Sequence, residues 1–332
     1  MGDVKNKDFS SGVKKVSMQY MGQIIFLVAM FVYLSFATPT FFTGMNLINV
    51  SRQISTNMIV SCAMTMILIT AGIDLSVGSV MALAGMVAGY MSIAGCPFWF
   101  CLIVSLLAGA AAGLVNGVIL ANTTLAPFIV TYCTQSILRG MVYVITTAGT
   151  LRLVDQDFLN FGGGSVGIMP YPVIYMIIVM IISYLILHRT AMGRHMYAIG
   201  GNPKAAKFAG INSKSIIIFI YTLSGVLAAL SGLIYTSRNT SMQPSLGTGV
   251  EMDAIAAVVL GGTSMAGGQG GILGTILGAV IIGIINNGLN LMRMDSFWQY
   301  IAKGIVILIA VYIDYIKGIR MKNVKKQSAG KR

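Results

Sequence analysis

The sequence has few charged residues, and this scarcity excludes a soluble fold. Asp, Glu, Lys and Arg make up 9% of its 332 residues, whereas apolar residues make up 56%. A soluble domain averages about 25% charged residues. With a mean hydropathy of +0.83, most of the chain must have lipid rather than water as its solvent. The composition therefore predicts an all-α polytopic membrane protein.

The groups that carry enzyme chemistry are scarce as well. The two histidines, His188 and His195, share one basic segment and have no carboxylate nearby in the sequence. The motifs H-E-x-x-H and G-x-S-x-G are absent, as is the Walker motif G-x-x-x-x-G-K-[ST] that cradles ATP phosphates. We therefore expect no catalytic residue, no metal site and no cofactor in this chain, and an intramembrane enzyme is disfavoured.

The sequence contains only four cysteines. Cys62 and Cys133 lie inside apolar runs and are interpreted as small core residues. Cys96 and Cys101 flank a short polar break, where a disulfide is one alternative. Because a C-x4-C pair without histidine is weak evidence, two free thiols are favoured.

Ten apolar runs qualify as membrane-spanning helices, each of which needs about 20 mostly apolar residues. The eighth run is short and ends in glycines. The first run comes after Lys14 and Lys15, as the apolar region of a signal peptide would. The many later runs favour its interpretation as a first span. The scheme gives an N-terminal tail 1–20, a transmembrane domain 21–316 and a basic tail 317–332. The runs lie near residues 21–38, 54–71, 77–94, 98–120, 126–147, 171–188, 215–236, 251–265, 271–290 and 297–316.

Basic residues orient these spans, because cytoplasmic loops are enriched in Lys and Arg. Four lysines precede the first span, five basic residues lie in the loop 188–214, and seven follow the tenth span. All of these face the cytoplasm if both termini do, and Arg52, Arg152, Arg238 and Arg293 then face outward. The net charge of +13 thus indicates topology and contact with anionic membrane lipid, and no nucleic acid is expected as a partner.

A faint internal repeat is visible in two spans. The fourth span ends with GLVNG at 113–117, and the ninth ends with GIINNG at 283–288. The two spans run in opposite directions, which fits spans two to five and seven to ten as inverted repeats. The match is so short that chance similarity explains it equally well.

The loop 188–214 contains signals for a short helix outside the membrane. Asn202 suits the N-cap, Pro203 the first helical position, and Gly210 the C-terminal stop. Small residues and one projecting aromatic suit a socket on another protein, whereas an interfacial helix on lipid headgroups is an equal alternative. The residues concerned are Asn202, Pro203, Lys204, Ala205, Ala206, Phe208, Ala209 and Gly210.

Two further segments combine glycines with polar residues. In AGIDLSVGS at 71–79, Asp74 and Ser76 can cap the following helix, and Gly78 permits close backbone approach. An intramembrane carboxylate is often functional, but capping is favoured here. The segment 261–271, GGTSMAGGQGG, predicts non-helical backbone or very close helix packing at membrane depth. Its structural glycines include Gly261, Gly262, Gly267 and Gly268.

Four charged residues fall at or within the outer half of the membrane. Arg139 and Lys303 are positive, and Glu251 and Asp253 are negative. Charges in lipid need partners, so the four are expected to neutralise one another. Two interpretations fit equally well. The charges are either a polar lining of a translocation path, or structural ion pairs whose long side chains reach toward the membrane surface.

Three motifs give the chain a specific resemblance to a known family. They are GIDLSVGS at 72–79, AIGGNPKAAKFAGI at 198–211 and EMDAIAAVVLGGTSMAGGQGGILGT at 251–275. They resemble the signatures of ribose-type ABC transporter permeases, whose relatives carry galactose, xylose, allose, inositol or autoinducer-2. The resemblance covers about residues 20–318 and implies a permease subunit of a bacterial plasma-membrane importer for a monosaccharide or sugar-like solute.

The resemblance also implies partners and a fold. The permease would be a homodimer or heterodimer with the ten-span fold of the vitamin B12 importer permease. Two separate ATPase subunits would bind ATP and Mg²⁺ on the cytoplasmic face, and a sugar-binding protein would dock outside. The segment 202–210 corresponds to the helix that couples to the ATPase. The fifth and tenth spans line the central path, which points to Arg139 and Lys303.

One rival function comes from a different class of transporter. An ion-coupled secondary transporter would use Asp74, Glu251 or Asp253 as its proton or sodium site. It would not need the capped cytoplasmic helix.

Overall fold

The computed structural model describes residues 2–153, 155–295, 297–302, 304–305, 308–309 and 312, with side chains from Tyr20 onward. Three sequence-based expectations fall outside these residues: the position of Lys303, the basic tail 317–332 and most of the tenth span. The lysines of the N-terminal tail lie in a described helix, but their side chains are likewise outside the description.

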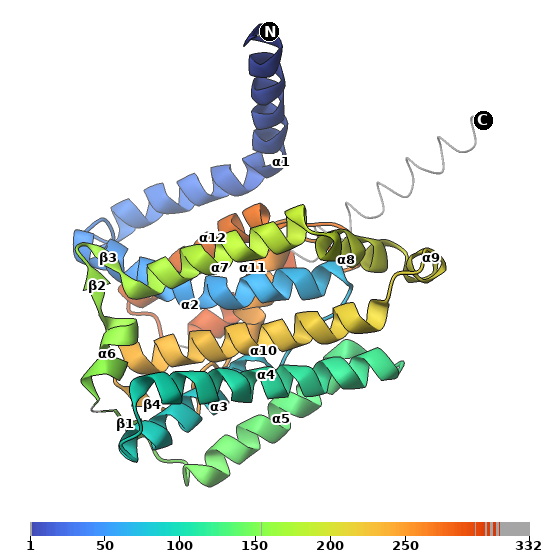
Figure 1. Cartoon of the computed structure of the whole chain (residues 1–332). Coiled ribbons are helices and arrows are strands. Elements are labelled where there is room, and N and C mark those ends of the chain that lie inside the picture. Colours follow the sequence, from blue (N-terminus) through green and yellow to red (C-terminus); the bar gives the residue numbers. More distant parts are fainter. Residues whose placement is uncertain are drawn as a thin grey trace.

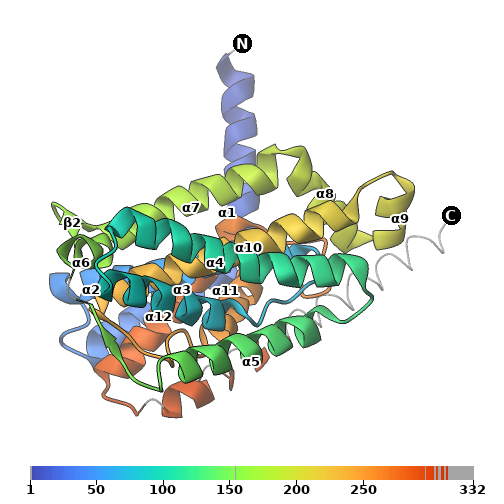
Figure 2. The same cartoon turned by 60° about the horizontal axis from the view of Figure 1, so that its bottom comes forward.

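Within these residues the chain is mostly helical. Figures 1 and 2 show long helices lying side by side, with short strands and most of the short helices at the ends of the bundle. The helices are α1 (Gly2–Ala37), α2 (Gly44–Ile69), α3 (Val77–Ile93), α4 (Phe98–Asn122), α5 (Pro127–Ile145), α6 (Gln156–Gly163), α7 (Tyr171–Arg189), α8 (Ala191–Gly201), α9 (Pro203–Phe208), α10 (Ser213–Arg238), α11 (Val250–Leu260) and α12 (Ile272–Leu291).

Six of the described helices are long and apolar enough to cross a membrane. They correspond to the first, fourth, fifth, sixth, seventh and ninth of the predicted spans. Their outward-facing apolar side chains are exposed, as expected where lipid is the solvent. The six segments are Tyr20–Ala37, Phe98–Asn122, Pro127–Ile145, Tyr171–Arg189, Ser213–Arg238 and Ile272–Leu291.

The second, third and eighth predicted spans take other forms. The helix α2 begins at Gly44, well before the expected residue 54, because the side chain of Thr43 caps its first turn. The helix α3 has 17 residues and is slightly short for a span. The helix α11 has 11 residues and rises only about 16 Å, roughly half of the bilayer core. The expected eighth span at 251–265 is therefore corrected to a short helix followed by a glycine-rich turn.

Four short strands, which the sequence pattern did not predict, join loops at the end of the bundle. β1 (Leu151–Arg152) pairs antiparallel with β4 (Ser241–Met242), and β2 (Ser165–Val166) pairs antiparallel with β3 (Met169–Pro170). Each has two residues, too few to produce a periodic pattern. The β1–β4 pair links the loop after α5 to the loop after α10.

Glycines bring α4 and α10 into close contact along their length. A Cβ atom on Gly109, Gly113 or Gly117 would collide with the backbone of α10. These glycines recur every four residues and form one face of α4, where the missing side chains let the two backbones approach. The contact fixes α4 antiparallel to α10, because Gly117 lies near the start of α10 and Gly109 near its middle.

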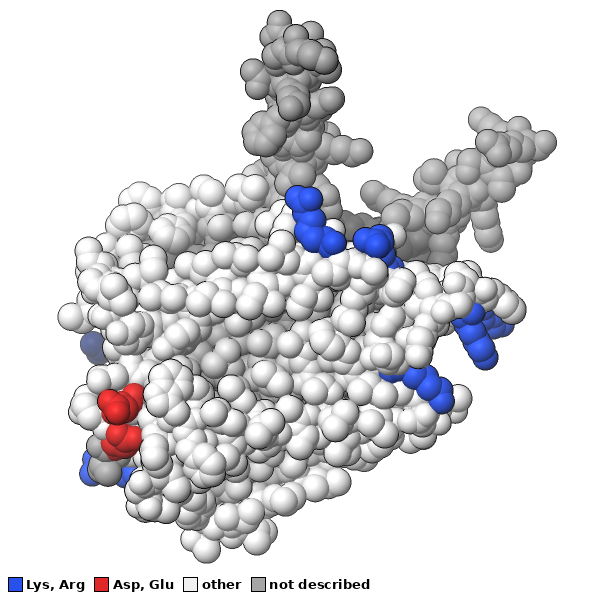
Figure 3. Space-filling model, in the orientation of Figure 1, with Lys and Arg blue, Asp and Glu red and all other residues white. Residues whose placement is uncertain are grey.

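Charged residues separate to the two ends of the bundle, as Figure 3 shows for one face. One end, which we call the basic end, carries Arg189, Arg194, Lys204, Lys207 and Lys214 around α8 and α9. The opposite end carries Arg52, Arg152 and Arg238 together with Asp155 and Asp157 near α6. The helix α4 ends at the basic end and α12 begins there, so the two spans with similar endings run in opposite directions, as predicted.

Candidate coupling and transport sites

The helix α9 at the basic end has the termini that the sequence predicts. The Asn202 side-chain oxygen accepts a hydrogen bond from the backbone N–H of Ala205 at 3.0 Å, and Pro203 is the first helical residue. The helix ends before Gly210, whose φ of +76° lies in the left-handed region. The result is a helix of 6 residues, too short to be stable alone in water.

Most of α9 is exposed. Phe208 is 91% exposed, and Ala205, Ala209, Lys204 and Lys207 are exposed as well. The buried member is Ala206, which packs into the hydrophobic core. The helix therefore presents small residues, one aromatic ring and two cations outward, while Ala206 attaches it to the rest of the chain. The outward surface suits a protein partner, as the sequence indicated for Ala205 and Phe208.

A helix that the sequence analysis missed, α8, attaches α9 to the bundle. The Tyr197 hydroxyl donates a 2.7 Å hydrogen bond to the Gly270 carbonyl oxygen. The backbone N–H of Gly268 donates to the carbonyl of Ile69 at the end of α2, at 2.8 Å. A Cβ atom on Gly200 would collide with that same carbonyl. The α8 backbone is thus packed directly against the ends of two other elements.

Burial affects the chemistry of this attachment. It raises the pKa of Tyr197 to about 12, above the ordinary value of about 10. The hydroxyl therefore stays protonated, and able to donate to Gly270, throughout the physiological pH range.

The glycine-rich segment 261–271 is non-helical and tightly packed, as predicted. Gly262, Gly267, Gly268 and Gly270 all have positive φ, a region that favours glycine. A Cβ atom on Gly261 would collide with the backbone of Gly274 in α12. The segment turns the chain between α11 and α12 and forms the surface on which α8 rests.

The N-termini of α3 and α11 meet inside the bundle and form what we call the intramembrane junction. A Cβ atom on Gly78, in the first turn of α3, would collide with the Gly247 carbonyl just before α11. Gly247 has a φ of +76°. Two short helices meeting end to end in this way resemble the broken helices that form solute and ion sites in transporters.

Glu251 lies at this junction. Its side chain is 6% exposed, and Oε1 accepts from the backbone N–H of Gly249 at 3.3 Å and from Gln135 Nε2 at 3.4 Å. Oε2 has no hydrogen-bond partner among the described residues. It lies against the first turn of α3, beside Gly78. The positive ends of two helix dipoles therefore converge on this carboxylate.

Arg139, on α5, holds the loop that leads into α11. Its Nη1 donates to the carbonyl oxygens of Pro244 at 2.7 Å and Leu246 at 2.6 Å. It also attracts Glu251 electrostatically, although the described residues show no ion pair between the two. Arg139 thus binds backbone carbonyls and Glu251 accepts from N–H groups. Mutual neutralisation of the full set stays a prediction, because Lys303 lies outside the described residues.

Asp74 and Ser76 do not cap α3 through their side chains, which corrects the favoured interpretation. Asp74 Oδ1 accepts from the N–H of Ser76 at 2.9 Å and from the Ser76 hydroxyl at 2.6 Å, and Oδ2 accepts from Ser224 of α10 at 2.8 Å. Asn116 of α4 donates to the Ser76 hydroxyl and accepts from Thr134 of α5. Asp74 thus begins a buried network that joins the α2–α3 loop to three helices.

The two endings of the faint repeat have corresponding contacts. Asn116 of α4 bonds Ser76 at the start of α3, and Asn286 of α12 donates to Asp253 Oδ2 in the first turns of α11 at 3.2 Å. In each case an asparagine near a glycine holds the beginning of a short helix. Lys303, the fourth residue of the predicted charge set, lies outside the described residues.

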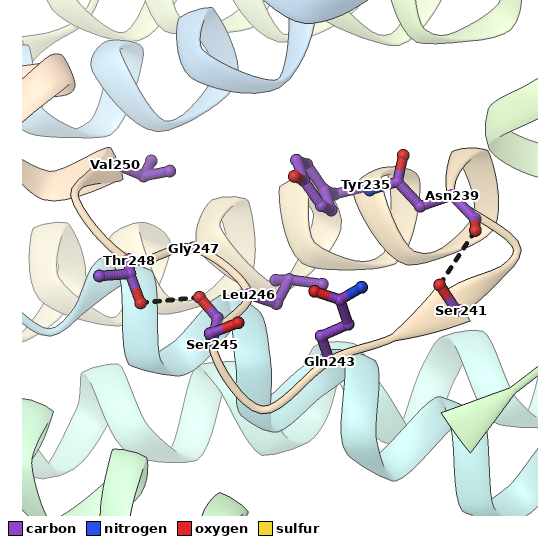
Figure 4. A pocket seen from close by; sticks show the side chains of 9 residues that line it. All are labelled: Tyr235, Asn239, Ser241, Gln243, Ser245, Leu246, Gly247, Thr248 and Val250. Carbon is purple, nitrogen blue, oxygen red and sulfur yellow. Dashed lines mark hydrogen bonds between the residues drawn. The ribbon is translucent and has the colours of Figure 1, made fainter. Parts of the chain in front are cut away.

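A small polar cavity opens between the end of α10 and the loop before α11 (Figure 4). Its volume is about 140 Å³. The lining residues come from a helix end and a loop, so they do not form a cluster within one span. The lining consists of Tyr235, Asn239, Ser241, Gln243, Ser245, Leu246, Gly247, Thr248 and Val250. Hydroxyl and amide groups beside an aromatic ring can bind a polar solute.

The remaining predicted features are placed as follows. All four cysteines are free thiols, which agrees with the favoured interpretation of Cys96 and Cys101. Among the described residues, no group of three or more histidine, cysteine or acidic side chains could hold a metal ion.

Comparison with known proteins gives consistent matches over nearly the whole chain. Residues 46–311 match the family described as the permease component of the branched-chain amino acid transport system. Ribose import permease protein RbsC of Haemophilus influenzae is 43% identical over 300 residues, covering 89% of this chain and 93% of that protein. No solved structure matches the chain significantly.

Two proteins from Escherichia coli strain K12 are also similar to this chain over most of its length. Its ribose import permease protein RbsC is 45% identical over 297 residues, covering 88% of this chain and 92% of the relative. Its D-allose transport system permease protein AlsC is 38% identical over 291 residues, covering 87% and 89%. The helical multi-pass fold and these matches together define a membrane-spanning transport component. The chain belongs to the family of ribose-type ABC transporter permeases.

Proposed function

We propose that this chain is the permease subunit of an ATP-driven importer for a monosaccharide or sugar-like solute. The observation that carries the proposal is α9, a capped helix whose Phe208 and Ala205 are exposed at the basic end. The relatives, by name a ribose import permease and a D-allose transport system permease, support a sugar as the solute.

The proposed assembly has partners on both sides of a bacterial plasma membrane. The basic end faces the cytoplasm, with both termini, because basic residues concentrate there. Two ATPase subunits bind ATP and Mg²⁺ and receive α9 of each permease. A sugar-binding protein docks at the opposite end and supplies selectivity. A second permease copy, identical or related, completes a dimer.

The contacts of α8 suggest how movement passes through the chain. Closure of the ATPases displaces α9, and α8 moves with it. Tyr197 and the Gly200 backbone then push on the glycine-rich segment and on the end of α2. The glycine-rich segment follows α11 and the end of α2 leads into α3. The two short helices of the intramembrane junction therefore shift and change which side of the path is open.

Reconstitution tests the proposal against its rival. The permease is placed in liposomes with its ATPase and sugar-binding protein, and solute uptake is measured with and without ATP. Uptake should require ATP and all three components. Uptake by the permease alone under a proton or sodium gradient would instead establish an ion-coupled transporter using Asp74, Glu251 or Asp253.

A further inference from the structure

Cys96 and Cys101 meet at the corner between α3 and α4. The Cys101 thiol donates a hydrogen bond of 3.6 Å to the carbonyl oxygen of Cys96, and the two thiol groups are close enough to interact electrostatically. Pro97 is the N-cap residue of α4. The two cysteines therefore occupy the N′ and N4 positions of this helix, whose side chains often pack against each other.

The backbone on both sides of this pair is fixed. The N–H of Cys96 donates to the Met91 carbonyl at 3.0 Å, and Gly95 turns the chain with a φ of +78°. The N–H of Cys101 donates to the Pro97 carbonyl at 3.1 Å in the first turn of α4. The chain thus holds the two residues together before any bond joins their sulfurs, which favours a disulfide because the bond tolerates little distortion.

The two thiols differ in access to solvent. Cys96 is partly exposed, whereas Cys101 is buried. Trp99 in the same turn is exposed, as is typical of tryptophan at a membrane–water interface. An oxidant dissolved in water can therefore reach Cys96 before it reaches Cys101. The corner lies at the end of the bundle opposite α9, because α4 ends at the basic end (Figure 1).

We propose that Cys96 and Cys101 are a redox-active dithiol that a small-molecule disulfide oxidises to an intrachain disulfide. The structure shows the reduced form, with both thiols free. The narrow access to Cys96 beside Trp99 favours a small oxidant over a folded protein. The closed bond would tie the end of α3 to the first turn of α4.

The reaction is thiol–disulfide exchange in two steps. The Cys96 thiol loses its proton, and its sulfur attacks one sulfur of the oxidant, so that half of the oxidant leaves as a thiol. Cys101 then loses its proton and attacks the Cys96 sulfur of the mixed disulfide, which releases the second half as a thiol. The two cysteines lose two electrons, and the oxidant gains these electrons and both protons.

The cellular compartment decides whether this reaction occurs in the living cell. Compartments outside the plasma membrane are oxidising, whereas the cytoplasm keeps thiols reduced. Oxidation in the cell therefore rests on the proposed function, which places this end outside the membrane. The pairing of the two thiols rests only on the contacts at the corner.

Mass spectrometry tests the pairing in the full-length permease held in lipid nanodiscs. The protein is incubated with oxidised or reduced glutathione, its remaining thiols are blocked with N-ethylmaleimide in denaturant, and the chain is digested with chymotrypsin. Chymotrypsin cuts between the two cysteines, because Phe98, Trp99 and Phe100 lie there. Only a disulfide then holds the two peptides together.

Oxidised glutathione should remove N-ethylmaleimide labelling from Cys96 and Cys101 together and yield the linked peptides, which separate on reduction. Cys62 and Cys133 are internal controls, since they lie on α2 and α5 and should form no linked peptide. If Cys96 and Cys101 both remain fully labelled after oxidation, the dithiol is overturned. This measurement needs no substitution, so it does not depend on the folding of a variant.

Two variants separate the steps. Cys101→Ser should stop at the mixed disulfide and carry glutathione on Cys96, whereas Cys96→Ser should leave the buried Cys101 unmodified. Oxidation should raise the unfolding temperature of the wild type but not of either variant, and similar temperatures in the reduced state would show that the variants fold. Glutathione on Cys101 in Cys96→Ser would contradict the proposed order of attack.

A second arm examines intact cells that are quenched in acid before blocking and digestion. The linked peptides should be present in these samples. Pairing in nanodiscs with free thiols in cells would contradict the proposed orientation and leave the dithiol standing. Failure to pair in nanodiscs would overturn the dithiol and leave the proposed transport function intact.

Discussion

Gly78 and Gly247 meet backbone to backbone at the intramembrane junction. A Cβ atom on either residue would collide with the carbonyl group of the other. Gly247 also has a φ of +76°, so it needs glycine for its conformation as well as for space. Gly78 lies in an ordinary helical turn, where only the close approach excludes a side chain. The beginning of α3 and the beginning of α11 are therefore in direct backbone contact, with no room for a side chain between them.

The substitution Gly78→Ala should destabilise the junction. In an exposed helix alanine would be favoured over glycine by roughly 1 kcal/mol, but overpacking here should cost about 1–3 kcal/mol. We expect a lower unfolding temperature and impaired ATP-dependent solute uptake. The control is Gly140→Ala in α5, because a Cβ atom at Gly140 meets nothing within 4 Å. If Gly78→Ala and this control have the same unfolding temperature and the same solute uptake, the close contact is not required for stability or transport.

The substitution Tyr197→Phe should loosen the attachment of α8 to the glycine-rich segment. It removes the hydroxyl that donates to Gly270 but keeps the ring, so about 0.5–1.5 kcal/mol of stability should be lost. We expect the ATPase still to bind the permease and hydrolyse ATP, while the ratio of solute taken up to ATP hydrolysed falls. Tyr132→Phe, at an exposed position of α5, should leave this ratio unchanged. An unaltered ratio in Tyr197→Phe would show that the hydrogen bond does not transmit motion.

The same hydroxyl predicts a pH dependence. Its pKa is raised to about 12 in the folded protein, whereas the unfolded value is about 10. The stability that it contributes is therefore complete below about pH 10 and is lost as the pH rises toward 12. Wild type and Tyr197→Phe should thus differ by a constant amount at neutral pH and converge in alkali. Unfolding temperatures of both proteins, measured from neutral pH to pH 12, check this. Convergence well below pH 10 would show that the tyrosine titrates earlier than predicted.

The substitution Ala205→Glu tests whether α9 binds the ATPase. Ala205 is exposed, so a larger side chain does not disturb the permease itself. In a close-fitting socket it should cost about 1–3 kcal/mol, which would weaken co-purification of the ATPase about 5- to 150-fold. Ala191→Glu makes the same change at an exposed position of α8 and should retain the ATPase. Normal ATPase binding by Ala205→Glu would indicate that α9 rests on the membrane surface instead.

The substitution Arg139→Met should release the loop before α11. It removes both hydrogen bonds to the carbonyls of Pro244 and Leu246, and bonds from a charged donor contribute about 1.5–3 kcal/mol each. We expect less folded protein in the membrane. Adding Glu251→Gln should partly restore the yield, because an uncompensated intramembrane carboxylate is itself costly. Arg152→Met serves as the control, and strictly additive effects of Arg139→Met and Glu251→Gln would show that the two charges do not interact.

Impermeant thiol labelling tests the orientation in a cysteine-free background. Lys204→Cys at the basic end and Asp157→Cys at the opposite end both occupy exposed positions. In intact cells only Asp157→Cys should react, and both should react after the membrane is opened. Labelling of Lys204→Cys from outside would place the basic end outside the cell and contradict the proposed ATPase partner.

Local signals in the sequence were sufficient for α9. An N-cap, a proline and a terminal glycine act on their own neighbours, and Asn202, Pro203 and Gly210 therefore specify where the helix begins and ends. The six described spans were equally predictable, since a long apolar run in lipid has to be helical to satisfy its backbone. The glycines at 261–271 likewise indicated tight, non-helical backbone before the structure showed which partners they contact.

Tertiary structure alone decided which of these segments meet. The carboxylate of Asp74 was expected to cap the helix next to it, but its Oδ1 accepts from Ser76 and its Oδ2 accepts from Ser224 of α10. The α8 contacts and the Gly78–Gly247 approach join residues that are far apart in the sequence. The conformational preference of a short segment does not predict which distant segment it will meet. A pattern of neighbouring residues reports local conformation, whereas helix-on-helix packing determines which backbone and polar groups are brought within bonding distance.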